Sequence, residues 1–248
     1  MSGDVRMTFW DHLEALRGTI LRSVAAVTVS AVFVFCFKSI VFDGILLWPT
    51  RTDFPFYRLT GSQFSMELVN YEMSAQFFVH LRVSFISGLI LACPYVLFEI
   101  WKFIVPALYE KERKAAKASF LSAALLFYAG IAVGYFLILP LVLEFFMNYK
   151  VSDYILNTIS LKSYISTFTS LVFVFGLVFE YPAVTALLSR LGVINRSDMV
   201  KARKYAVVAI LIVSAIITPA DPLSMVIAAV PLYLLYEGGI LLCGNNKK

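Results

Sequence analysis

Residues 119–147 have the sequence SFLSAALLFYAGIAVGYFLILPLVLEFFM, and this stretch decides the fold class. It contains a single charged side chain, Glu144. It is also longer than the roughly 20 residues that an α-helix needs to cross about 30 Å of hydrocarbon. A helix that is apolar on every side lies either in a protein core or in lipid. We therefore expect this stretch to span a membrane.

The rest of the chain has the same character. Three more segments are long and apolar enough to cross a bilayer, namely residues 20–37, 77–103 and 164–191. Charged residues make up only 15% of the 248 residues, against roughly 25% in soluble domains, and the mean hydropathy is +0.82. So few charged residues cannot shield this much apolar surface from water. We expect an integral membrane protein rather than a soluble enzyme.

The C-terminal part is expected to form two shorter helices. Residues 205–218 are apolar over only about 21 Å of helix, and Pro219 and Pro222 then mark a turn before a second short run. The sequence therefore predicts an all-α polytopic membrane protein, one transmembrane domain over residues 1–248 with six transmembrane helices, the last two short. The expected spans are approximately residues 18–38, 76–104, 118–147, 163–190, 204–218 and 222–242.

Prolines and aromatic residues add detail to this prediction. Proline removes a backbone donor and bends helices, which favours a concave wall over a straight bundle. The prolines within or beside the expected spans are Pro94, Pro106, Pro140, Pro182 and Pro231.

The long segment between the first two spans, residues 39–75, contains Trp48, Tyr57 and Tyr71. We expect it to form an ordered cap at the membrane interface.

Lysine and arginine are distributed unevenly over the segments between the spans. Fifteen lie on one side of the expected membrane and five on the other, while Arg82 lies inside a span near its outer end, where it can snorkel to the interface. Loops rich in Lys and Arg stay in the cytoplasm. Both termini are therefore expected to be cytoplasmic, which requires an even number of crossings.

The sequence contains no pattern for catalysis or metal binding. It has no glycine-rich phosphate loop and no nucleophile elbow, only two histidines, and three cysteines that all lie in apolar stretches. The net charge of +5 comes without a basic helix interleaved with stacking aromatics. We therefore expect no enzyme activity, no cofactor, no metal and no nucleic-acid partner.

Glu180 is the most informative single residue. It lies ten residues before Arg190, about 15 Å of helix rise, and is expected close to the bilayer midplane. A charged acid there costs on the order of 2.5–3.5 kcal/mol on insertion scales. Two explanations stay open: a protonated glutamate bonded to a neighbouring helix, or a polar group that faces a water-filled cavity or a partner helix.

Acidic side chains also lie at the expected cytoplasmic surface. Glu14 belongs to an amphipathic segment ahead of the first span, and Glu110 and Glu112 lie in a charged loop after the second. A helix on the membrane surface and a solvated loop are the simple structural explanations. Carboxylates at the same height can also hold arginines of an incoming peptide through bidentate, charge-assisted hydrogen bonds.

Five motifs, in this order along the chain, resemble the TatC family, the multispanning core subunit of the twin-arginine protein translocase. They are His12-Leu13-x-x-Leu16-Arg17; Trp101-Lys102-Phe103-Ile104-Val105-Pro106-Ala107-Leu108-Tyr109-x-x-Glu112-Arg113; Leu126-Phe127-Tyr128-x-Gly130; Phe175-Gly176-x-x-Phe179-Glu180-x-Pro182; and Thr218-Pro219-x-Asp221. Their order and spacing cover nearly the whole chain.

The resemblance implies a concave, glove-like arrangement of six helices in the bacterial cytoplasmic (inner) membrane. It implies a subunit that recognises twin-arginine signal peptides of folded cargo. With single-span TatA-type and often TatB partners, and with self-association in a translocase complex, such a subunit exports that cargo using the proton motive force. Similarity assigns Glu112, Glu14, Arg17, Phe103 and Glu110 to signal-peptide binding, and Glu180, Thr218, Asp221 and Met225 to intramembrane polar or partner contacts.

Two positions depart from the family pattern. Where the family has an acid, this chain has Ala15, with Glu14 one residue earlier. One residue turns a helix by about 100°, so Glu110 and Asp11 are alternatives for that acid. Met225 stands where some relatives carry a glutamine.

Two other functional classes compete with this prediction. The first is a proton-coupled small-solute transporter with Glu180 as the proton carrier, which predicts internal repeats and a broken helix at the midplane. The second is an intramembrane enzyme, which predicts a catalytic partner at the depth of Glu180. The sequence shows none of these features.

Overall fold

The computed structural model describes residues 9–105, 110–152, 154, 157–190, 192–218 and 222–243, and of residues 9 and 110–121 it describes the backbone alone. The fold is all-α, as predicted. The longer helices are α1 (Phe9–Cys36), α3 (Ala75–Ile104), α4 (Glu110–Val133), α5 (Leu139–Asn148), α6 (Leu161–Phe179), α7 (Tyr181–Arg190), α8 (Arg196–Ile217) and α9 (Pro222–Leu242).

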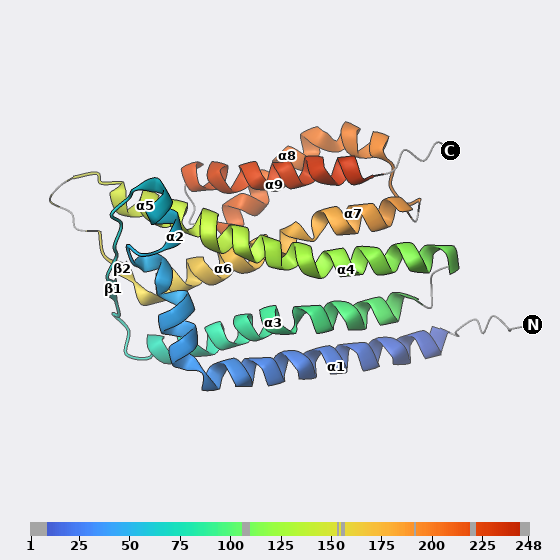
Figure 1. Cartoon of the computed structure of the whole chain (residues 1–248), viewed down its shortest axis with the longest axis horizontal. Helices are drawn as coiled ribbons and strands as arrows, with labels where there is room; N and C mark the ends of the chain where they lie inside the picture. The colour runs from blue at the N-terminus through green and yellow to red at the C-terminus, as the bar shows by residue number, and fades with distance from the viewer. Residues whose placement is uncertain are drawn as a thin grey trace, which may run out of the picture.

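The long helices lie side by side along the length of the molecule (Figure 1). α1 begins and α9 ends at the same end of the bundle, which we call the terminal end. The smaller elements lie at the opposite end, the cap end: η1 (Ile40–Leu46), η2 (Trp48–Thr50), α2 (Pro55–Thr60), β1 (Leu68–Val69) and β2 (Ile159–Ser160).

In the part of the chain that the structure describes, five helical runs are long and apolar enough to cross a membrane. They are Trp10–Cys36, Ala75–Ile104, Ser122–Asn148, Leu161–Arg190 and Pro222–Leu242. Each overlaps one of the expected spans. The expected span over residues 204–218 lies in α8, whose first turns carry Arg196, Asp198 and Lys201. α8 packs along α9, and six crossings with a concave surface agree with this arrangement.

Three expected boundaries differ from the structure. The first helix starts at Phe9, because the amphipathic segment continues into the span without a break. The third expected span passes through a π-helical turn, η4 (Gly134–Ile138), just before Pro140. The fourth is interrupted at Glu180, between α6 and α7. Proline accounts for both interruptions, since it removes an i→i−4 hydrogen bond.

The segment after α1 forms a cap with its own core. Phe54 and Tyr57 are fully buried there. The Tyr57 hydroxyl donates to the Pro49 carbonyl, and burial raises the pKa of Tyr57 well above its usual value, so the donor keeps its proton. Strands β1 and β2 pair in parallel, with Leu68 opposite Ile159. These contacts tie the cap to the start of α6 and confirm the ordered segment that its aromatic residues predict.

Two glycines from the motifs allow α4 and α6 to approach closely. A Cβ atom on Gly130 would lie 2.5 Å from the Phe175 carbonyl oxygen and 2.7 Å from Phe179 Cβ. A Cβ atom on Gly176 would lie 2.8 Å from Ile131 Cδ1. Small residues at facing positions are the usual means by which membrane helices come into backbone contact. The glycines in these motifs therefore have a packing role, which places the end of α6 against α4.

Candidate functional site

The helical hydrogen-bond pattern changes at Glu180. The Glu180 N–H donates to the Leu177 carbonyl at 3.1 Å, an i→i−3 bond that tightens the last turn of α6. Pro182 has no N–H to offer the Val178 carbonyl, and the helix resumes as α7 from Tyr181. The sequence signal for this break was Pro182 itself. The span is thus kinked at Glu180 and not unwound, because Glu180 keeps right-handed helical dihedral angles (φ −70°, ψ −19°) and its carbonyl accepts from the Val184 N–H at 3.0 Å.

Glu180 lies where three apolar cavities meet. One of about 470 Å³ runs between α1, α3 and the end of α6, with Val27, Leu89 and Leu97 in its wall. A second, of about 510 Å³, opens toward α8 and α9 and includes Ile210 and Leu232. A third, of about 350 Å³, lies toward α7 and the last turns of α3. Glu180 contributes the carboxyl group in the lining of all three cavities.

The Glu180 carboxyl has no protein partner on one of its oxygens. Oε1 is buried and makes no hydrogen bond within the described part of the chain. The explanation of a glutamate bonded to a neighbouring helix therefore finds no support at this atom. An unsatisfied buried acceptor costs about 1–3 kcal/mol. The arrangement fits the other explanation, a polar group that awaits a partner in a cavity.

The final hairpin residues lie away from these cavities. Thr218 is buried and ends α8, where its hydroxyl donates to the Ser214 carbonyl at 2.9 Å. Met225 is half-buried in the first turns of α9. The cavity beside Glu180 includes Val213 and Leu232, which are five and seven residues from Thr218 and Met225 respectively. Asp221 lies outside the described residues.

At the terminal end, α1 contacts α3 through a row of side chains. His12 stacks on Phe103 with ring centroids 4.4 Å apart, Thr19 is buried, and Arg22 bonds to Glu99. These α1 positions share one face of the helix, and Ala15 lies on the same face. Glu14 is 100° away from Ala15, and it is exposed, as is Arg17. Glu14 therefore does not occupy the place of an acid at position 15.

The acids of the second motif lie in the first turn of α4. That helix begins at Glu110, so Glu110 and Glu112 belong to its terminal-end turn, while their side chains lie outside the described residues. The start of α1, the end of α3 and the start of α4 all lie at this end of the bundle (Figure 1). A helix N-terminus favours acidic side chains electrostatically. The backbone thus brings the predicted peptide-binding segments to one end.

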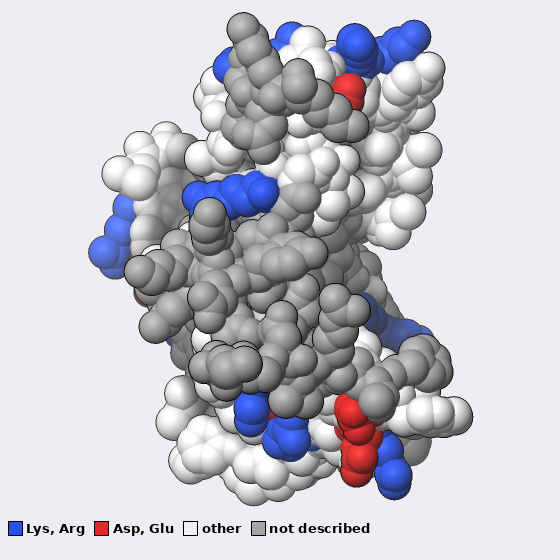
Figure 2. Space-filling view, turned by 90° about the vertical axis from the view of Figure 1, so that its right-hand side faces the viewer, with Lys and Arg blue, Asp and Glu red and all other residues white. Residues whose placement is uncertain are grey.

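The terminal end is surrounded by basic side chains. Figure 2 looks onto this end and shows lysine and arginine side chains around its edge, with few acids among them. The exposed basic residues in the terminal-end turns of the helices are Arg17, Arg22, Lys102, Arg190, Arg196, Lys201, Arg203 and Lys204. This is the side on which the sequence has its excess of Lys and Arg.

The charged pair that joins α1 to α3 was not predicted from the sequence. Arg22 Nε donates to Glu99 Oε2 at 2.7 Å, and the Glu99 side chain is only 4% exposed. The sequence shows one charged residue in each of two neighbouring spans. Residue spacing alone does not show which charged residues contact each other. The pair joins α1 to α3 four residues before Phe103 on α3 and ten residues after His12 on α1.

Replacing Arg22 with leucine is expected to lower the thermal stability of the purified protein more than replacing Arg17 with leucine. Arg22→Leu leaves Glu99 buried without its cation, whereas Arg17 is exposed and has no partner in the described residues. Thermal unfolding in detergent measures the difference. The double variant Arg22→Leu/Glu99→Leu should recover most of the loss. Equal melting temperatures for both single variants would contradict the role of this pair.

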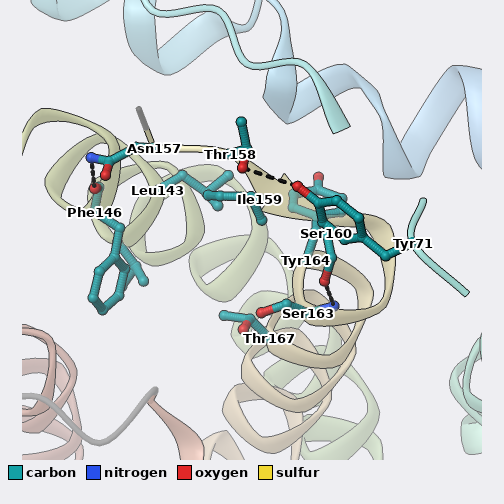
Figure 3. A pocket seen from close by; sticks show the side chains of 11 residues that line it. Tyr71, Leu143, Phe146, Asn157, Thr158, Ile159, Ser160, Ser163, Tyr164 and Thr167 are labelled. Atoms are coloured by element: carbon teal, nitrogen blue, oxygen red, sulfur yellow. Dashed lines mark hydrogen bonds between the residues drawn. The ribbon is translucent and has the colours of Figure 1, made fainter. Parts of the chain in front are cut away.

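A separate cavity of about 560 Å³ lies at the cap end (Figure 3). Its hydroxyl and amide groups bond to one another or to nearby backbone: Tyr71 to Thr158, Ser160 to the Ser163 N–H, and Asn157 to the Phe146 carbonyl. The lining contains no charged side chain. Within the described residues there is also no group of three or more His, Cys, Asp or Glu side chains placed to bind a metal.

Comparisons with known proteins agree with these features. The family profile "Sec-independent protein translocase protein (TatC)" matches residues 11–231. A Sec-independent protein translocase protein TatC from Blattabacterium sp. subsp. Periplaneta americana is 32% identical, with 94% of each chain covered. The TatC of Aquifex aeolicus is 34% identical over 95% of this chain and 94% of its own.

Solved structures show the same fold. The crystal structure of a twin-arginine translocase receptor, TatC, has 34% sequence identity and a TM-score of 0.79, with 93% of this chain and 97% of that chain covered. A structure of the receptor in the detergent DDM has 34% identity and a TM-score of 0.81, with 94% and 99% covered. With its helical fold, its motifs and these matches over nearly its whole length, the chain belongs to the TatC family, the Sec-independent protein translocase proteins.

Proposed function

We propose that this chain is the receptor subunit of a twin-arginine translocase. It binds signal peptides with two consecutive arginines and assembles with single-span TatA-type partners, and with TatB where one exists, to export folded proteins using the proton motive force. The observation that carries this proposal is the meeting of the α1 start, the α3 end and the acidic first turn of α4 at one end of the bundle. The small-solute transporter is set aside because the relatives that match nearly the whole chain are protein translocase proteins.

The peptide site is proposed at the terminal end. Glu112 and Glu110, in the first turn of α4, supply the carboxylates for the arginine pair, and the stacked rings of His12 and Phe103 supply an apolar surface beside them. Glu14 and Arg17 lie on the solvent side of α1 and contribute to the rim. Arginine binds carboxylates in bidentate fashion, which lysine does not reproduce.

Glu180 is proposed as the contact for a partner helix in the bilayer. Its buried, unbonded oxygen and the cavity toward α8 and α9 support this role, because a polar side chain on an entering helix would satisfy the acceptor. Thr218, Asp221 and Met225, near the turn between α8 and α9, are proposed to contact the same partner nearer the cap end.

The proposed location is the bacterial cytoplasmic membrane. The exposed basic residues of the terminal end support an orientation with both termini in the cytoplasm, since Lys and Arg remain preferentially on that side. The peptide site then faces the compartment in which cargo folds, and the cap faces outward.

Replacing Glu112 with glutamine is expected to weaken binding of a twin-arginine signal peptide about tenfold or more, because a hydrogen bond to a charged group is worth roughly 1.5–3 kcal/mol. Binding is measured by site-specific crosslinking and by pull-down in nanodiscs, with a twin-lysine peptide alongside.

The matched control is Asp198→Asn, which removes an exposed acid from the first turn of α8. This variant should bind the twin-arginine peptide normally. The twin-lysine peptide should bind poorly even to the unaltered protein. Unchanged crosslinking by Glu112→Gln, or an equal loss with Asp198→Asn, would remove Glu112 from the peptide site.

A further inference from the structure

Arg82, in the cap-end half of α3, is a charged side chain without an anionic partner among the residues that the structure describes. It lies seven residues into α3, about 10 Å along the helix from Ala75. Its Nη1 donates to Ser166 at 3.2 Å and its Nη2 to Ser170 at 3.4 Å, both on α6. The ion pairs among the described residues are Arg22–Glu99, Lys162–Glu72 and Arg203–Glu237, and Arg82 belongs to none.

A small cavity of about 180 Å³ joins Arg82 to a second cation. Its wall includes Arg82, Lys162 and Glu72. Lys162 Nζ bonds to both carboxylate oxygens of Glu72, at 2.8 and 3.0 Å, so this acid is already engaged. Two cations and one acid leave the cavity with one net positive charge. Arginine stays protonated, and its fork of donors matches a phosphate.

The position of Arg82 fits the boundary between headgroups and hydrocarbon. α3 has 30 residues and is about 45 Å long, longer than the roughly 30 Å of hydrocarbon, so several residues at each end lie among the headgroups. The same face of α3 carries Phe78 and Phe85, which are 63% and 57% exposed. A basic group between two exposed rings at this depth is placed to contact a lipid headgroup.

Below Arg82 the apolar surface continues toward the centre of the bundle. Phe85 and Leu89 follow Arg82 on one helix face and form part of the 470 Å³ cavity that ends at Glu180. That cavity offers room for an acyl chain beneath a headgroup bound at Arg82.

We propose that Arg82 and Lys162 bind the phosphate of an anionic phospholipid, whose acyl chain lies along Phe85 and Leu89. Basic pockets between membrane helices are suited to lipid phosphates, and one net negative charge on the lipid balances the one net positive charge of this cavity. The site is independent of the peptide site at the terminal end.

The test is native mass spectrometry of the protein released from nanodiscs that contain equal amounts of phosphatidylglycerol and phosphatidylcholine. The unaltered protein should retain phosphatidylglycerol preferentially. Arg82→Gln should retain roughly fivefold less, while Arg82→Lys should retain an intermediate amount. Arg58→Gln, which removes an exposed arginine of α2 at the cap end, should retain as much as the unaltered protein.

Equal retention by the unaltered protein and Arg82→Gln, or an equal loss in Arg58→Gln, overturns the proposal. Displacement of the lipid by millimolar sn-glycerol 3-phosphate would also overturn it, since the site would then take a soluble phosphate. Should Arg82→Gln not purify, Lys162→Gln serves instead. It frees the Glu72 carboxylate to repel a phosphate and should lower phosphatidylglycerol retention, and full retention by this variant counts against the proposal.

Discussion

Alanine at position 130 is expected to destabilise the protein by about 2–3 kcal/mol, whereas alanine at position 238 is expected to be neutral or stabilising. Both glycines lie in helices within apolar spans. The new Cβ at 130 would lie 2.5 Å from the Phe175 carbonyl oxygen, so α4 and α6 must move apart, with the loss of packing typical of overfilled cores. A Cβ at 238 meets no atom within 4 Å, and alanine favours a helix over glycine.

Thermal unfolding in detergent, followed by size-exclusion chromatography, separates the two outcomes. The change is a single methyl group at both sites, so the difference between the two variants reports the helix contact and not helix propensity. Gly176→Ala, on the other side of the same contact, should behave like Gly130→Ala, because its Cβ would lie 2.8 Å from Ile131 Cδ1. A melting temperature of Gly130→Ala equal to or above that of Gly238→Ala would contradict the close contact between α4 and α6 at this point.

Replacing Glu180 with leucine is expected to stabilise the isolated protein and at the same time to reduce export by more than tenfold. The carboxyl oxygen Oε1 is buried without a partner, so an apolar side chain removes a desolvation cost of about 1 kcal/mol. The same change removes the acceptor that we propose for a partner helix. The free energy of a hydrogen bond to a charged group is large enough to account for a tenfold loss of export.

Two measurements on the same variants test this prediction. Melting temperature in detergent should rise for Glu180→Leu, while export of a twin-arginine reporter and co-purification of the TatA-type subunit should fall. Glu180→Gln retains a polar group and should lose less export. Val184→Leu, which changes the volume of the same cavities without a change in polarity, should export normally. Normal export by Glu180→Leu would leave this carboxyl without a functional role.

Much of the fold follows from local properties of the sequence. An uninterrupted apolar run of sufficient length predicts a membrane helix because lipid forces every backbone group to bond within its own segment. The runs around residues 77–103, 119–147 and 164–191 accordingly appear as long helices. The same reasoning identified Glu180 as an acid in an apolar span, because a charge near the centre of the hydrocarbon is costly.

The tertiary structure decided which of these residues meet. The sequence contains Arg22 and Glu99, but only the rotation of α1 against α3 brings them to 2.7 Å. That rotation also leaves Glu14 exposed, while Ala15, on the helix face of His12, is half-buried. Contacts of this kind depend on crossing angle and helix separation, which small residues such as Gly130 set and which no local pattern encodes.

The environment of Glu180 also depends on how the helices pack. Hydrophobicity and helix rise act residue by residue. The order of residues alone is therefore enough to predict a helical membrane protein, the positions of its apolar spans, and an acid within one of them. Only the packed bundle brings this acid to three cavities, with an oxygen that has no hydrogen-bond partner among the described residues. The bundle also brings Arg82 to two serines and, in the same part of the chain, to no acid. Both depend on neighbours that are distant in sequence, and helix packing alone brings those neighbours together.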